Sequence, residues 1–170
     1  MPVNARWLFK TEPSDYSYQR LSREGRTAWD GVNNALALKH LRQVRRGDSI
    51  LIYHTGNEKA VIGIARAVGD SYPDPRDRSG KQVIVDVEPD RELRRPVTLA
   101  ELKARRDLAD FDLVRLGRLS VMPVSRERWE IILGLSRGAP AAARPSRQAG
   151  RKSARRATGR ARRRNSPTPV

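Results

Sequence analysis

Short apolar stretches, separated by residues that favour turns, make up most of the first 138 positions. Some stretches alternate apolar with polar residues, as Trp7 and Phe9 do in residues 6–10, and others are continuous apolar runs of strand length. Both patterns predict β-strands. The predicted strands are residues 6–10, 49–54, 60–68, 82–87 and 116–124. Gly63, in the middle of the third strand, predicts a bulge or a close backbone approach.

Apolar residues at helical spacing predict four short helices. They cover residues 16–24, which Gly25 ends, residues 36–44, with Leu36 on the apolar face, residues 99–105, and a closing segment that Ser125 caps and that ends near Gly138. Thr98 and Glu101 have the spacing of a capping box before the third helix. Residues 107–115 match neither pattern and are expected to be irregular. Together the elements predict an α+β fold, in which a mixed sheet curls into a small open barrel flanked by short helices.

Charge is distributed unevenly along the chain. Of 170 residues, 35 are Lys or Arg and 19 are Asp or Glu, which gives a net charge of +16. Residues 139–170 contain ten of the basic residues and no acidic one, so residues 1–138 carry a net charge of only +6. Ala, Arg, Pro, Ser and Gly dominate this last segment. We therefore expect one globular domain at residues 1–138 and a disordered basic tail at residues 139–170.

The cations of the tail suit a phosphate backbone, which they would bind with little sequence preference and strong salt dependence. They are Arg144, Arg147, Arg151, Lys152, Arg155, Arg156, Arg160, Arg162, Arg163 and Arg164. The alternatives are a tail that only improves solubility and a tail that contacts acidic proteins.

Several kinds of chemistry lack the residues they need. The chain has no cysteine and only two histidines, His40 and His54, so no disulfide and no metal centre is expected. Phosphate-loop and nucleophile-elbow motifs are absent. No apolar run reaches the about 18 residues of a membrane span, and the first residues lack the apolar core of a signal peptide. We expect a cytoplasmic protein without membrane or cofactor, in which His54 at a strand end is the one candidate general base.

Trp29 begins the stretch with the clearest binding chemistry. A glycine turn follows it, and then come Asn33 and Asn34 at the start of a helix. An indole in this place can stack on a planar ligand while amide groups read the polar edge of that ligand. Equally, Trp29 can be a core residue and one of the asparagines a helix cap. Trp7 and Trp129 lie in apolar-periodic elements and are assigned to packing.

Seven sequence blocks, taken in order, resemble the EVE domain. They are WLFKTEPSDYS, AWDGVNN, GDSILIYHTG, AVIGIARAV, YPDP, RPVTLAELK and GRLSVMPVSRERWEIIL, and they span roughly residues 5–134. EVE domains belong to the PUA-like superfamily and are similar to YTH domains, which hold a methylated adenine in an aromatic cage. The resemblance implies a mixed pseudo-barrel with a pocket for a modified or flipped-out base. Members of the family are associated with modified cytosine in DNA.

The resemblance also implies which residues line that pocket. They are Lys10, Ser14, Tyr16, Trp29, Asn33, Asn34, Tyr53, His54, Arg118, Leu119 and Ser120. Trp29 matches the tryptophan that forms a cage wall in the YTH relatives. Many family members read Gly-Val-Arg-Asn-Tyr after the tryptophan, where this chain has residues 31–35 as Gly-Val-Asn-Asn-Ala. An arginine and an aromatic residue are therefore missing from the rim, and the base preference is expected to differ.

The sequence thus predicts a non-enzymatic module that binds nucleic acid, with a modified cytosine in DNA as the favoured target and the tail adding affinity for phosphate. Three alternatives stay open. The first is an RNA-binding PUA-like module that acts on tRNA or rRNA. The second is an enzyme that acts on a nucleobase or nucleotide with His54 as the base. The third is a nucleoid-associated protein that binds through its tail. A monomer is the default expectation.

Overall fold

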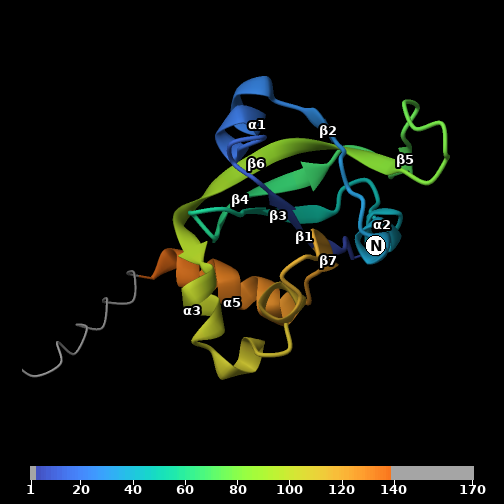
Figure 1. Cartoon of the computed structure of the whole chain (residues 1–170). Coiled ribbons are helices and arrows are strands. Elements are labelled where there is room, and N and C mark those ends of the chain that lie inside the picture. The colour runs from blue at the N-terminus through green and yellow to red at the C-terminus, as the bar shows by residue number, and fades with distance from the viewer. Residues whose placement is uncertain (1–2, 139–170) are drawn as a thin grey trace, which may run out of the picture.

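The computed structural model of the chain describes residues 3–138. Residues 1–2 and the whole predicted tail, residues 139–170, lie outside the described part. The described residues form a curled mixed sheet with short helices around it (Figure 1). This arrangement confirms the predicted α+β class and its curled sheet.

Seven strands form the sheet in the described part of the chain. They are β1 (Arg6–Thr11), β2 (Thr27–Trp29), β3 (Ser49–His54), β4 (Ala60–Ala67), β5 (Tyr72–Pro73), β6 (Val83–Thr98) and β7 (Val121–Pro123). The order across the sheet is β2-β6-β4-β3-β1-β7, and β5 pairs with β6. β1 runs parallel to β3, whereas the other pairs are antiparallel.

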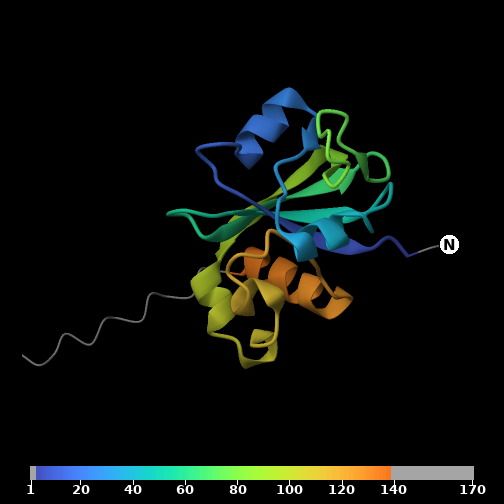
Figure 2. The same cartoon turned by 45° about the vertical axis from the view of Figure 1, so that its right-hand side comes forward.

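Five short α-helices and one 3₁₀ turn join these strands within residues 3–138. They are α1 (Tyr18–Glu24), α2 (Ala35–Leu41), α3 (Leu99–Lys103), η1 (Arg106–Leu108), α4 (Asp112–Arg115) and α5 (Arg126–Arg137). α1 lies on one side of the sheet, and α3 and α5 lie on the other (Figure 1, Figure 2). Helices on both sides explain why Trp7, Leu8 and Phe9 in β1, which lies between β3 and β7, are all buried.

Three predicted end signals of the helices are confirmed, although α2 ends at Leu41 and not near residue 44, and α3 ends at Lys103 and not at residue 105. Ser125 caps α5 by accepting a hydrogen bond from the Arg128 backbone, and Thr98 and Glu101 form the capping box of α3. Gly25 ends α1 in the left-handed conformation at φ 76°. Trp7 and Trp129 are buried, which confirms that both serve packing.

The strand predictions were wrong at several ends. β6 continues from Val87, where the predicted strand ended, to Thr98. Its second half carries exposed charged residues, which hide the strand pattern although β4 pairs with that half. β2, β5, η1 and α4 were not predicted because they have two to four residues each, too few for a periodic signal. The strand predicted for residues 116–124 is confined to β7.

Gly63 lies where α1 packs against the sheet. A β-carbon added there would lie 2.5 Å from a ring carbon of Tyr18, closer than such atoms approach one another. The β4–β6 register also shifts between Val61 and Gly63. The structure therefore confirms both the bulge and the close approach, and the glycine lets the buried Tyr18 ring lie directly on β4.

Candidate functional site

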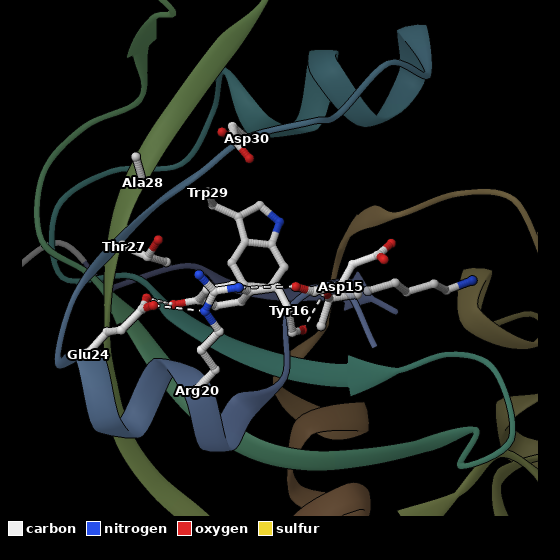
Figure 3. Close-up of a pocket in the computed structure, with 10 residues that line it drawn as sticks. Asp15, Tyr16, Arg20, Glu24, Thr27, Ala28, Trp29 and Asp30 are labelled. Atoms are coloured by element: carbon white, nitrogen blue, oxygen red, sulfur yellow. Dashed lines mark hydrogen bonds and ion pairs between the residues drawn. The ribbon is translucent and has the colours of Figure 1, made fainter. Parts of the chain in front are cut away.

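A hollow of about 390 Å³ opens between α1, β2 and the end of β1 (Figure 3). This volume lies within the usual range of small-molecule pockets. We call it the Trp29 hollow. Its lining residues are Lys10, Thr11, Asp15, Tyr16, Arg20, Glu24, Thr27, Ala28, Trp29 and Asp30.

Trp29 is the last residue of β2 and lies six positions before the first residue of α2. Only 7% of its surface is exposed, because its ring packs at 5.4 Å from the Phe9 ring and edge-on at 6.2 Å from the Tyr16 ring. The Phe9 and Tyr16 rings therefore cover most of the indole, and little of its surface is open to the hollow. The indole N–H makes no hydrogen bond within residues 3–138. Because every fully buried side-chain nitrogen in this part of the chain has a hydrogen-bond partner, the indole nitrogen is not fully buried. That N–H is thus a donor that a ligand can reach.

One face of the segment that contains α1 supplies the polar wall of the hollow. Arg20 and Glu24, four residues apart, lie on one side of α1, and Tyr16, two residues before its first residue, joins them through contacts of its side chain. The Tyr16 hydroxyl donates to Glu24 at 2.7 Å, Arg20 pairs with Glu24 at 2.8 Å, and the Arg20 guanidinium lies 5.0 Å from the Tyr16 ring centre. Burial, and then the hydrogen bond to Glu24, raises the pKa of Tyr16. This connected wall holds the ring that covers Trp29.

Lys10 contributes the cation of the hollow from the end of β1. Its ammonium nitrogen donates to the Gly117 carbonyl at 3.1 Å and to the Leu116 carbonyl at 3.5 Å, and it lies 5.8 Å from the Tyr53 ring centre. Burial lowers the pKa of Lys10 below its usual value. An ammonium group has three donors, so one is left for a ligand.

Two carboxylates complete the lining. Asp15 is exposed, and its carboxylate forms no hydrogen bond or ion pair within residues 3–138. Asp30 pairs through one oxygen with Arg76 at 2.7 Å. In Figure 3, Asp30 lies above the indole and Asp15 lies to its right. The hollow therefore offers acceptors as well as donors.

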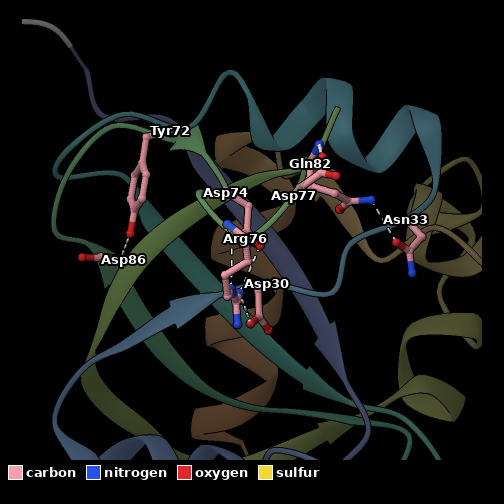
Figure 4. A network of polar contacts seen from close by, with 8 residues as sticks. All are labelled: Asp30, Asn33, Tyr72, Asp74, Arg76, Asp77, Gln82 and Asp86. Atoms are coloured by element: carbon pink, nitrogen blue, oxygen red, sulfur yellow. Dashed lines mark hydrogen bonds and ion pairs between the residues drawn. The ribbon is translucent and has the colours of Figure 1, made fainter. Parts of the chain in front are cut away.

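A loop from residue 72 to residue 82 supports the rim beside Asp30 (Figure 4). Arg76 joins Asp30 to Asp74, with ion pairs of 2.7 and 3.0 Å. The Asp77 carboxylate accepts hydrogen bonds from three backbone N–H groups within the loop, the shortest of them from Gln82 at 2.7 Å. These bonds, that from Gln82 first, lower the pKa of Asp77 to about 2. These ion pairs and hydrogen bonds hold the loop in place beside Asp30 at the rim of the hollow.

The predicted site residues do not all lie together. Trp29, Lys10 and Tyr16 line the Trp29 hollow, whereas Asn34, Arg118 and Leu119 line a second hollow beside it. Asn34 also caps α2 by accepting from the Ala37 N–H at 3.0 Å.

Three more of the predicted residues border the two hollows without lining them. Asn33 is exposed and accepts a hydrogen bond from Gln82 at 3.1 Å. Ser14 is exposed, with its hydroxyl 3.5 Å from Glu12. Ser120 contributes its backbone carbonyl to the Lys10 N–H at 2.9 Å.

Tyr53 and His54 are buried. Tyr53 lies beside Lys10 in the β1–β3 register. The His54 Nε2 atom accepts from the Tyr18 N–H at 2.9 Å, so the ring proton is on Nδ1, which lies 2.9 Å from Glu58. We call Tyr18, His54, Glu58 and Gly63 the Tyr18 cluster. Both ring nitrogens of His54 are engaged within it, and His54 does not line the Trp29 hollow.

The sequence prediction missed seven residues of the Trp29 hollow outright, namely Thr11, Asp15, Arg20, Glu24, Thr27, Ala28 and Asp30. Arg20 and Glu24 carried a usable signal, because their spacing from Tyr16 matches one face of the helix predicted at residues 16–24. Asp15 and Asp30 adjoin predicted residues, and only the fold shows that their side chains line the cavity.

Residues 3–138 contain no group of three or more His, Cys, Asp or Glu side chains arranged to hold a metal ion. Nor does this part of the chain include a helix of the length and apolarity that crossing a bilayer requires.

The sequence is similar to a known family and to curated proteins. A family model described as EVE domain matches residues 5–135. Thymocyte nuclear protein 1 from Homo sapiens is 27% identical over 172 residues, which cover 81% of this chain and 76% of that protein.

Solved structures share the fold over the same region. An NMR structure of a Rhodopseudomonas palustris protein superposes with a TM-score of 0.74 at 43% identity, covering 78% of this chain and 92% of that one. A crystal structure of human THYN1 protein in complex with DNA that contains 5-methylcytosine superposes with a TM-score of 0.75 at 27% identity. The second match covers 81% of this chain and 100% of that one.

Proposed function

This chain belongs to the EVE domain family, and we propose that it binds DNA carrying a modified cytosine and holds that base in the Trp29 hollow. The family match confirms the resemblance found in the sequence. The observation that carries the proposal is the likeness in fold and sequence to human THYN1, which was crystallised with DNA containing 5-methylcytosine. The chemistry of the hollow supports the same conclusion independently.

The lining of the hollow complements the edge of a cytosine. Cytosine carries an amino group that donates hydrogen bonds, and carboxylates are its usual partners in proteins. Asp15 and Asp30 present such carboxylates. The carbonyl oxygen and the unprotonated ring nitrogen of cytosine accept hydrogen bonds, and Lys10 and the Trp29 N–H are free to donate them. A hollow with both kinds of group can therefore satisfy the whole polar edge of the base.

The base must leave the helical stack to reach such a hollow. Flipping it out costs a few kcal/mol, which contacts with the DNA backbone must offset. The basic residues at 139–170, proposed as a tail on a domain at residues 1–138, supply cations for such contacts. Because the tail and the hollow are tethered, binding by one raises the effective concentration of the other.

We propose a reader without catalysis. The enzyme alternative needs His54 as a general base beside the ligand. Both ring nitrogens of His54 are engaged in the Tyr18 cluster, and its side chain is buried. A base that is to take up a proton from a substrate must be within hydrogen-bond reach of it, and His54 does not line the hollow.

Replacement of Trp29 by phenylalanine tests the proposal. Trp29→Phe keeps an aromatic ring in the core but removes the indole N–H and part of the ring of this lining residue. Loss of one hydrogen bond costs about 0.5–1.5 kcal/mol, so we expect roughly fivefold weaker binding to an oligonucleotide with 5-methylcytosine, measured by fluorescence anisotropy. Binding to the same oligonucleotide with plain cytosine sets the baseline.

Trp129→Phe is the matched control. Trp129 is also 7% exposed, so the same substitution should cost similar stability, but it lies on α5 and lines neither the Trp29 hollow nor the second one. We expect Trp129→Phe to bind both oligonucleotides as the unchanged chain does. Equal preference for modified and plain cytosine in the unchanged chain, or equal losses in both variants, would refute the proposal.

A further inference from the structure

The second hollow, beside the Trp29 hollow, has a different lining. It measures about 350 Å³, and we call it the Leu36 hollow. Its lining residues are Asn34, Leu36, Arg115, Leu116, Gly117, Arg118 and Leu119. The sequence pattern put Leu36 on the apolar face of a helix that packs inward. In the structure, Leu36 is instead 42% exposed on the first turn of α2.

The two hollows are neighbours, because a residue that lines the first bonds to residues that line the second. Lys10 lines the first, and its ammonium group donates to the carbonyls of Leu116 and Gly117, which line the second. On the opposite side, the segment that follows Trp29 borders the first hollow with Asp30 and the second with Asn34. A ligand longer than one nucleotide would therefore pass from one hollow directly into the other.

The lining of the Leu36 hollow is apolar with cationic groups. Leu36, Leu116 and Leu119 provide the apolar part. Arg118 is exposed and forms no hydrogen bond or ion pair with the described residues 3–138, whereas Arg115 is paired with Asp112 at 3.4 Å. An apolar surface next to an unneutralised guanidinium suits a sugar or base face that is joined to a phosphate.

We propose that the Leu36 hollow holds the nucleotide next to the recognised base in the same DNA strand, with the Arg118 guanidinium on its phosphate. This inference rests on the function proposed for the Trp29 hollow and adds a second binding position to it. Nucleotides adjacent in a strand are covalently joined, so the site for a neighbour must adjoin the base pocket. The hydrogen bonds from Lys10, in the Trp29 hollow, to the carbonyls of Leu116 and Gly117, in the Leu36 hollow, meet that requirement.

The test compares variants of the full chain. Arg118→Gln removes the guanidinium from an exposed side chain, and Leu36→Ser removes the exposed apolar group. Arg106→Gln is the control, because Arg106 is also exposed, its guanidinium has no partner within residues 3–138, and it lines neither hollow. Each variant is titrated with a single-stranded hexanucleotide carrying 5-methylcytosine, with its plain-cytosine counterpart, and with the free nucleoside 5-methyl-2′-deoxycytidine.

We expect Arg118→Gln to weaken binding of both hexanucleotides by about tenfold, since it removes a charge-assisted hydrogen bond, and to lower the slope of log affinity against log salt by about one. Leu36→Ser should weaken both by roughly threefold because less apolar surface is buried. Binding of the free nucleoside, followed by NMR shifts, should not change in either variant, because it has no neighbouring nucleotide.

The outcomes separate the two proposals. If Arg118→Gln and Arg106→Gln weaken the hexanucleotides equally, or if Arg118→Gln weakens the free nucleoside as much as the hexanucleotides, the neighbour site is wrong whatever the base preference. If the unchanged chain binds modified and plain hexanucleotides equally while Arg118→Gln still weakens both more than Arg106→Gln does, recognition of the modified base fails. In that case the strand contact at the Leu36 hollow is retained.

Discussion

The Tyr18 cluster and the Trp29 hollow meet where the ends of β1 and β3 pair. Lys10 and Thr11 of β1 line the hollow, and Thr11 pairs with His54 of the cluster across β1 and β3. In the cluster, the buried His54 ring has a partner at each nitrogen. In the hollow, the Trp29 N–H has no partner among residues 3–138.

The difference shows that residue type at a strand end does not distinguish structure from binding. A histidine whose donor and acceptor are both satisfied inside the protein contributes to stability, because a ligand could gain a bond to it only by breaking one. A donor without a partner at the edge of a cavity costs the protein nothing when a ligand takes it up. Changes in the cluster should therefore affect stability, and changes in the hollow should affect binding.

The largest effect is expected in the cluster, from Gly63→Ala. The added methyl group would lie 2.5–2.8 Å from ring carbons of the buried Tyr18, which has to shift. Such overpacking typically lowers the free energy of unfolding by about 1–3 kcal/mol, and urea denaturation measures it. The control is Gly134→Ala on α5, where no atom lies within 4 Å of the added carbon, so a gain of about 0.5–1 kcal/mol is expected. Equal stabilities of the two variants would contradict the assignment.

A smaller and opposite pattern is expected in the hollow, from Lys10→Met. Methionine keeps most of the buried alkyl chain but removes the ammonium group, so the free energy of unfolding should change by less than about 1 kcal/mol. Binding to the 5-methylcytosine oligonucleotide should weaken by about tenfold, since a charge-assisted hydrogen bond is lost. Lys39→Met, at an exposed position of α2 outside both hollows, should leave affinity nearly unchanged. Equal affinities of the two variants would remove Lys10 from the site.

The smallest effect is expected in the loop of residues 72–82 when the pH is lowered. Because the pKa of Asp77 is depressed from 3.8 to about 2, its contribution to stability is complete above pH 3.8 and is lost as the pH falls through about 2. The amide NMR signals of Ser79 and Gln82 should therefore shift with a midpoint near pH 2, and Asp77→Asn should abolish that titration. A midpoint near pH 4 would show that the carboxylate does not hold the loop under the hollow.

Much of the fold was predictable because its signals are local. The alternation in residues 6–10, the caps at Ser125 and Thr98, and the glycine at Gly25 each act within a few residues of chain, and the structure confirms each. The second half of β6 was not predictable, since its charged residues face solvent while its backbone pairs with a strand distant in sequence.

The sequence by itself determined the family, the fold class and three residues of the hollow, Trp29, Lys10 and Tyr16, because ordered motifs and short-range periodicity are written along the chain. Only the tertiary structure decided which polar groups are free. The Tyr18 N–H, 36 residues away in the sequence, occupies the acceptor nitrogen of His54. The Gly117 carbonyl, 107 residues away, holds the ammonium group of Lys10. Hydrogen bonds between such distant segments form only when the chain is folded, so no local pattern can indicate which donors they leave for a ligand.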